Sequence, residues 1–125
     1  MSSLVVANVL AGIPVGDMDA AIDWYTRLLG RRPDAQPMPG LADWNFPNQQ
    51  TLQLVLDTGR AGGGIVTLHV ADIAAARDAL AREDIHLDLD DTTSNKVEFG
   101  QLTDPDGNSI SLIEPLPGFL PTASH

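Results

Sequence analysis

Although the sequence has 17 acidic residues and three histidines, few of them lie where they could do acid–base chemistry on a ligand. Thr67 and His69 share one face of an alternating segment, so the imidazole could act as a general base or as a pH-dependent ligand contact. The alternative is a histidine near a strand end that bonds to backbone, since the sequence places no acidic partner beside it. Ser109 and Ser111 lie outside a nucleophile-elbow motif and show no pairing with His and Asp, so no hydrolase constellation is recognised.

Aromatic and amide side chains suggest binding rather than bond-breaking chemistry. Trp44 and Phe46 alternate on a predicted strand, and their rings could hold a cation or a planar ring in a concave site. Ordinary core packing is the alternative for both rings. Gln101 is a candidate for the same site. Glu114 points opposite to Ser111 by the strand period of two, so we do not expect its carboxylate to lie in this site.

Two stretches of the chain resemble each other and would position these residues. Residues 10–21 and residues 65–76 each run from an alternating apolar strand into an Asp and then into a helical pattern. These acids, Asp17 and Asp72, are each expected to cap a helix by accepting from the free N–H groups of its first turn. A strand-to-helix unit that occurs twice indicates a duplicated module rather than a solenoid.

Apolar periodicity predicts the remaining elements. One helix follows Asp17 and ends at Gly30, and a second follows Asp72 and ends near Asp84. The Pro-rich residues 31–40 form an edge strand or a loop, and the glycines at 62–64 form a linker. Strands are expected where apolar residues alternate, at 52–56, 65–70, 96–103 and 108–114, with a turn at 104–107.

The composition is that of a globular domain. Hydrophobic residues make up 43% of the 125-residue chain, which is enough for a core, and the lack of cysteine excludes a disulfide scaffold. The formal net charge of -10 repels nucleic acid and anionic membranes; it would suit a cationic ligand, or it serves solubility alone. Residues 4–15 lack the basic flank of a signal peptide and no apolar run approaches membrane-spanning length. We therefore expect a cytoplasmic protein with no nucleic-acid or membrane partner.

Two motifs carry a resemblance to a known family. Residues 15–30, VGDMDAAIDWYTRLLG, and residues 104–115, DPDGNSISLIEP, are similar to the first-module signature and the last hairpin of the glyoxalase/bleomycin resistance protein/dioxygenase (vicinal oxygen chelate) superfamily. The resemblance implies an α+β fold of two tandem βαβββ modules, whose half-barrel sheets surround a cleft, in a protein that pairs as a homodimer. We expect a single domain over 1–125, with modules at 1–60 and 63–115 and a tail at 116–125.

The resemblance also assigns four positions where the family's enzymes hold a metal ion. They lie on the first and last strand of each module, and here they are Leu10, Gln53, Ile65 and Ser111. Leu and Ile have no lone pair to donate, and Gln and Ser are weak neutral ligands for a divalent ion. Metal-dependent glyoxalase, dioxygenase and epimerase chemistry is therefore not expected, and neither is any cofactor.

The cleft that the resemblance implies is mostly apolar, which is usual for an organic ligand site. The leading hypothesis is a metal-free protein that binds a small organic molecule, as in the bleomycin-resistance branch. A cofactor-independent isomerase, lyase or cyclase, with His69, Gln53 or Gln101 handling protons, is the alternative, and a dimeric scaffold with a vestigial site is a third. The expected ligand contacts are Leu10, Trp44, Phe46, Gln53, Val55, Ile65, Thr67, His69, Phe99, Gln101 and Ser111.

The four neutral positions lead to a prediction about metal content. Purified protein without a His-tag should carry no stoichiometric zinc, nickel, iron or manganese after extensive dialysis, because no anionic or imidazole ligand stands at those positions. Elemental analysis measures this directly. One metal ion per chain that resists EDTA would contradict the prediction.

Overall fold

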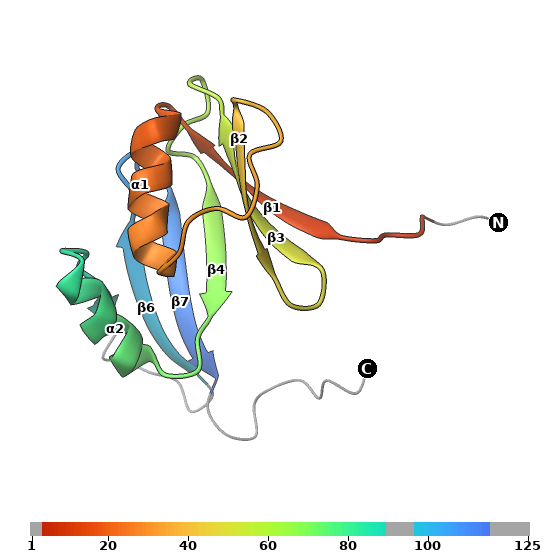
Figure 1. The fold of residues 1–125 in the computed structure, drawn as a ribbon. Coiled ribbons are helices and arrows are strands. Elements are labelled where there is room, and N and C mark those ends of the chain that lie inside the picture. The colour runs from red at the N-terminus through yellow and green to blue at the C-terminus, as the bar shows by residue number, and fades with distance from the viewer. Residues whose placement is uncertain (1–3, 90–96, 116–125) are drawn as a thin grey trace. The chain divides into compact units, whose positions relative to one another are not determined.

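The computed structural model describes residues 4–89 and 97–115, so the expected tail at 116–125 lies outside the described residues. The chain forms two compact units (Figure 1). One comprises the residues through Gly64 together with Asp104–Asn108, and the other comprises Ile65–Thr103 and the residues from Ser109. The elements are β1 (Val9–Val15), α1 (Met18–Leu29), β2 (Leu41–Phe46), β3 (Gln50–Leu56), β4 (Ile65–His69), α2 (Ile73–Arg82), β5 (Asp88–Leu89), β6 (Val97–Thr103) and β7 (Ser109–Pro115).

The sheet of the first unit has the strand order β1-β3-β2. β1 pairs with β3 in parallel, and β2 pairs with β3 antiparallel. Alternating apolar residues turn one face of this sheet toward α1, where Ile13 and Leu54 are almost wholly buried. Ala21 and Tyr25 of α1 are buried with them, and removal of this apolar surface from water is the main force that holds the unit together.

Both helices begin where the sequence predicts. The side chain of Asp17 accepts a hydrogen bond from the Ala20 N–H, and that of Asp72 accepts one from the Ala75 N–H, which confirms both caps. Gly30 ends α1 in the left-handed conformation, with a φ of 77° that favours glycine. The helices have 12 and 10 residues, and among the described residues no helix is long and apolar enough to span a membrane.

The sheet of the second unit has the order β4-β7-β6-β5. β4 pairs with β7 in parallel, and the β6–β7 hairpin is antiparallel. Ile110 and Leu112 of β7 are buried together with Ile73 and Leu80 of α2. The two sheets and two helices confirm the α+β class.

In the βαβββ pattern a strand directly follows each helix, and in this structure that strand is replaced by a loop after α1 and is short after α2. Residues 31–40 form a loop, in which Ala35 makes an isolated antiparallel β-bridge to Asp43 of β2. In the second unit, β5 has only two residues. Prolines at 33, 37 and 39 explain the loop of the first unit, because proline has no N–H to donate to a strand ladder.

A buried carboxylate organises the turn between β6 and β7. Asp104 is 5% exposed and accepts four hydrogen bonds: from the Tyr25 hydroxyl at 2.6 Å, from the Asn108 side-chain amide at 2.8 Å, and from the Asp106 and Asn108 backbone N–H groups at 2.9 Å each. Asn108 also donates to the Pro14 carbonyl and accepts from the Gly64 N–H. Burial and the bond to Asp104 raise the pKa of Tyr25 well above its ordinary value, so its hydroxyl remains a donor.

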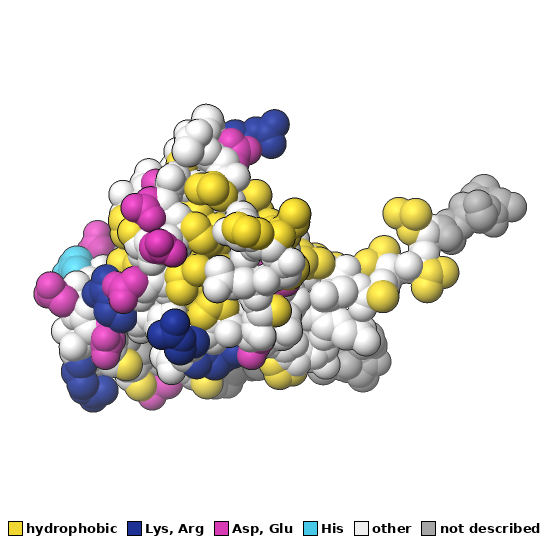
Figure 2. All heavy atoms as spheres, turned by 45° about the horizontal axis from the view of Figure 1, so that its top comes forward, with side chains coloured by type: hydrophobic (Ala, Val, Ile, Leu, Met, Phe, Trp, Pro, Cys, Tyr) yellow, Lys and Arg dark blue, Asp and Glu magenta, His cyan; other side chains and the backbone are white. Residues whose placement is uncertain are grey.

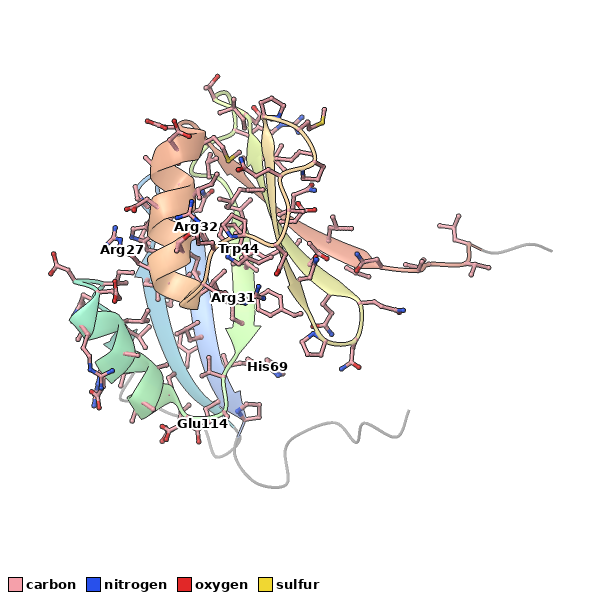
Figure 3. The ribbon with its side chains drawn as sticks, in the orientation of Figure 1. Arg27, Arg31, Arg32, Trp44, His69 and Glu114 are labelled. Carbon is pink, nitrogen blue, oxygen red and sulfur yellow. The ribbon has the colours of Figure 1, made fainter. Side chains whose placement is uncertain are left out.

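Trp44 is a core residue of the first unit. Its side chain is fully buried, its ring centroid lies 6.2 Å from that of Tyr25, and its Nε1–H donates to the Arg31 carbonyl at 2.9 Å. Figure 3 shows Trp44 between α1 and the strands. Phe46, two residues further along β2, is half-buried beneath the Arg31 guanidinium, which lies 5.3 Å from the ring centroid. Core packing, the alternative for both rings in the sequence, therefore describes Trp44.

Replacement of Trp44 by alanine should destabilise the protein strongly. We expect Trp44→Ala to lower the free energy of unfolding by about 3–5 kcal/mol, because it leaves a cavity and removes the partner of the Arg31 carbonyl. Phe46→Ala serves as the matched control and should cost clearly less, since that ring is only half-buried. Urea denaturation followed by circular dichroism measures both, and equal stability of the two variants would contradict the assignment.

Candidate functional site

The strand pairings define which side chains share a face of the first sheet. Side chains alternate along a strand, and residues paired across two strands project to the same side. One face packs on α1, and we call the opposite face the open face of the first unit. Its positions are Leu10, Gly12 and Pro14 of β1, Thr51, Gln53 and Val55 of β3, and Leu41, Asp43 and Asn45 of β2.

The same reasoning defines the open face of the second unit. Ile110 and Leu112 are buried on the α2 side, so the alternate residues of β7 and their partners project to the other side. The positions of this open face are Ile65, Thr67 and His69 of β4, Ser109, Ser111 and Ile113 of β7, and Phe99, Gln101 and Thr103 of β6.

The two open faces are the same arrangement of positions, filled with different residues. On the first, Leu10 of β1 pairs with Thr51 of β3. On the second, Ile65 of β4 pairs with Ser109 of β7. Both pairs join the first and last strands of a module in parallel, so the repeat seen in the sequence is present in the strand register.

At the centre of each open face, a residue of the last strand of the module pairs with a residue of the strand before it. In the first unit, Gln53 of the last strand pairs with Asp43. In the second, Ser111 of the last strand pairs with Gln101. Each face thus has a polar pair at its centre, one of which includes a carboxylate.

Hydrogen bonds link the polar side chains of the first open face. Gln53 Nε2 donates to Asp43 Oδ1 at 2.9 Å. Thr51 donates its hydroxyl to Asn45 Oδ1 at 3.1 Å, and Asn8 Nδ2 donates to Thr51 at 3.2 Å. These bonds fix the orientations of the polar side chains on the first open face.

The second open face is less internally bonded. Thr67, His69 and Gln101 are exposed, whereas Ser111 is buried. Figure 3 shows His69 at the end of β4, with its side chain directed away from α2. Within residues 4–89 and 97–115, nothing forms a hydrogen bond with the His69 side chain, so the backbone bond considered for it does not occur there.

Most of the sequence-predicted site residues share the open faces, but two do not. Trp44 and Phe46 occupy the face of β2 that α1 covers, because Trp44 pairs with buried Leu52. The expectation that the two rings line the ligand cleft is therefore corrected: they lie on the face of the sheet opposite to Gln53. The other nine expected contacts lie on one open face or the other: Leu10, Gln53, Val55, Ile65, Thr67, His69, Phe99, Gln101 and Ser111.

Because the sequence analysis assigned the wrong face of β2 to the site, it missed the residues that lie on the open face of this strand. Leu41, Asp43 and Asn45 alternate with the aromatic positions, and the polar pair Asp43 and Asn45 was the signal available in the sequence. Glu114 behaves as predicted, since it projects away from Ser111 and accepts a hydrogen bond from the Ile73 N–H at the start of α2.

The residues at the four metal positions do not fit a divalent ion. Leu10 and Ile65 are 46% and 83% exposed aliphatic side chains without a lone pair, and Gln53, whose Nε2 donates to Asp43, has only a neutral amide oxygen to offer. Among the described residues, no cluster of three or more His, Cys, Asp or Glu side chains could hold a metal. Both open faces thus carry hydrogen-bonding and apolar groups, and the four positions themselves offer no anionic or imidazole ligand.

Two hollows of the described surface lie away from the open faces. One, of about 240 Å³, is lined by Asp19, Ile22, Asp23, Thr26, Arg32 and Gln36 of the first unit. The other, of about 220 Å³, is lined by Arg77, Ala81, Asp84, Ile85, His86 and Leu87 of the second unit. Neither contains an open-face residue.

Comparison with known proteins identifies the family. Residues 6–112 match the model of the Glyoxalase/Bleomycin resistance protein/Dioxygenase superfamily. A glyoxalase/bleomycin resistance protein from Catenulispora Acidiphila DSM 44928 is 32% identical, with a TM-score of 0.80, over 88% of this chain and 98% of that chain. A superfamily member from Sphaerobacter thermophilus DSM 20745 is 26% identical, with a TM-score of 0.64, over 88% and 98% of the two chains.

A third structure has the same fold at lower identity. The antibiotic binding protein TnmS3 from Streptomyces sp. CB03234 is 24% identical, with a TM-score of 0.77, over 92% of this chain and 100% of that chain. A search of curated proteins gave no match. The family match over most of the sequence, together with the paired modules, shows that the chain belongs to the glyoxalase/bleomycin resistance protein/dioxygenase superfamily.

Proposed function

We propose that the protein binds a small organic molecule on its open faces without a metal ion. The observation that carries the proposal is the residue set at the four metal positions, where two aliphatic side chains, an amide and a hydroxyl stand. A binding protein of this superfamily can dispense with the ion, because it does not need to polarise its ligand for a reaction. Further support comes from the fold it shares with an antibiotic binding protein.

The chemistry of the two faces indicates what kind of molecule would be held. Each face has a polar pair at its centre and a row of larger apolar groups beside it. In the first unit, that row contains Leu41 and Val55, which pair with each other. In the second, it contains Phe99 and Ile113. A ligand with a flat or bulky apolar body and a few hydrogen-bonding groups matches this pattern.

An exposed imidazole favours a second candidate function, a cofactor-independent isomerase, lyase or cyclase. His69 lies on the second open face with no hydrogen-bond partner among the described residues, so its ring is available to move a proton. Chemical conversion of the bound molecule would separate this function from binding alone.

Native mass spectrometry of protein purified from its own host tests the proposal, because it should reveal a co-purified small molecule. Calorimetry with that molecule should then show about tenfold weaker binding to Gln101→Arg, which places bulk and charge at the centre of the second open face. Ala79→Arg, an exposed position of α2, is the matched control and should bind like wild type. If the purified protein retains no small molecule, the result contradicts the proposed binding and favours a scaffold with a vestigial site.

We also propose that the protein pairs with a second copy of itself. Support comes from an apolar segment before β1, in which Leu4, Val5 and Val6 are 90%, 97% and 64% exposed. Figure 2 shows hydrophobic side chains along this segment. β1 is itself an edge strand of its sheet, and exposed edges and apolar segments of this kind are usually covered. A two-fold pair is the commonest way to do so.

Light scattering at tens of micromolar should therefore give about twice the 13.3 kDa mass of one chain. Val5→Lys should shift the protein toward the monomer, because it places a charge in the apolar segment. Met38→Lys, at an exposed apolar position of a loop, should leave the mass unchanged. A wild-type protein that stays at the mass of one chain would contradict the proposal.

A further inference from the structure

Asp43 is the one acidic side chain among the open-face positions defined above. It lies at the centre of the first open face, where the equivalent position of the second face is the neutral Gln101. The two faces are otherwise built from apolar, hydroxyl and amide groups and a single imidazole. A carboxylate at the centre of one face therefore makes the two faces chemically unequal.

The backbone of Asp43 is held from both sides. Its N–H donates to the Ala35 carbonyl at 2.8 Å, and its carbonyl accepts from the Asp34 N–H at 2.8 Å. On the other side, β2 pairs with β3 at Gln53. The carboxylate consequently projects from a fixed point of the sheet rather than from a loop tip.

The side chain is also oriented, but only one of its oxygens is used. Gln53 Nε2 donates to Oδ1 at 2.9 Å, while Oδ2 forms no hydrogen bond within the described part of the chain. The Asp43 residue is half-buried, so solvent reaches it from the open side of the sheet. One oxygen is thus set in place by a neighbour, and the other is left for a donor from outside.

No arginine of the described residues forms an ion pair with Asp43. Arg31, on the neighbouring loop, instead binds Asp34 at 2.6 Å and the Asn45 carbonyl at 2.7 Å. The Arg31 side chain holds the pKa of Asp34 below its ordinary value through this bond. The charge of Arg31 is therefore already committed to Asp34, and the Asp43 carboxylate has no ion-pair partner within the described residues.

We propose that Asp43 selects the ligand of the first open face, and that this ligand is an organic cation. A protonated amine or amidine would donate to Asp43 Oδ2 while its apolar body rests on Leu41 and Val55, which pair next to Asp43 and Gln53. A charge-assisted hydrogen bond of this kind is stronger than a neutral one. The net charge of -10 also favours the approach of a cation. The inference rests on the proposed binding function and names its ligand class.

Calorimetry with two dyes of the same shape tests the inference. Aminoacridine is a planar aromatic cation at neutral pH, and acridine is its neutral counterpart. Wild-type protein should bind the cation more tightly than the neutral dye. Asp43→Asn should bind the cation about tenfold more weakly and leave the affinity for acridine unchanged, because the amide oxygen can still accept from Gln53 while the charge is lost.

Asp78→Asn, which removes the same charge from the exposed surface of α2, should leave both affinities unchanged. Thermal melts of the variants verify that each is folded. If acridine and aminoacridine bind equally well and Asp43→Asn changes neither, the assignment of Asp43 is wrong while binding of an organic molecule stands. If wild-type protein binds neither dye, the inference and the proposed binding of a planar organic ligand both fail.

Discussion

The first unit depends on one buried carboxylate, which is stabilised by hydrogen bonds from neutral donors rather than by a cation. An ionised group costs several kcal/mol to bury when it is left unpaired. Asp104 avoids this cost because a phenol, an amide and two backbone N–H groups donate to it. Tyr25 brings α1 to this point, and Asn108 brings the end of β1 through Pro14. Residues far apart in the chain are thereby fixed at one position.

Gly62 and Gly64 are explained by the same cluster. Gly62 has a φ of 91°, and a Cβ at this position would collide with the Asp106 carbonyl. A Cβ on Gly64 would lie 2.9 Å from Asn108 Oδ1, which accepts from the Gly64 N–H. The segment is therefore more than a flexible linker, since close approach of two backbones requires residues without side chains.

The fold could be predicted from the sequence because its signals are local. Asp17 and Asp72 cap their helices as expected, whereas the strand pairing of the structure is needed to place Gln101 and Ser111 on one face. Alternation alone does not tell which of its two faces a strand buries. For β2 the sequence analysis placed the ring of Trp44 in the ligand site. Only the register against β3, which pairs Trp44 with buried Leu52, shows that this ring lies in the core. The bond between Tyr25 and Asp104 had no signal at all, because 79 residues separate them.

The matching open faces bear on how such a protein can change over time. Folding depends mainly on the positions that face the helices, whereas the exposed positions of the open faces, such as Thr67 and Gln101, can vary without disturbing the core. Equivalent positions of the two open faces can therefore acquire different chemistry one substitution at a time. Asp43 and Gln101 stand at equivalent positions of the two faces, and only Asp43 carries a charge. A fold built from two modules with the same strand register can in this way carry two surfaces that differ in charge.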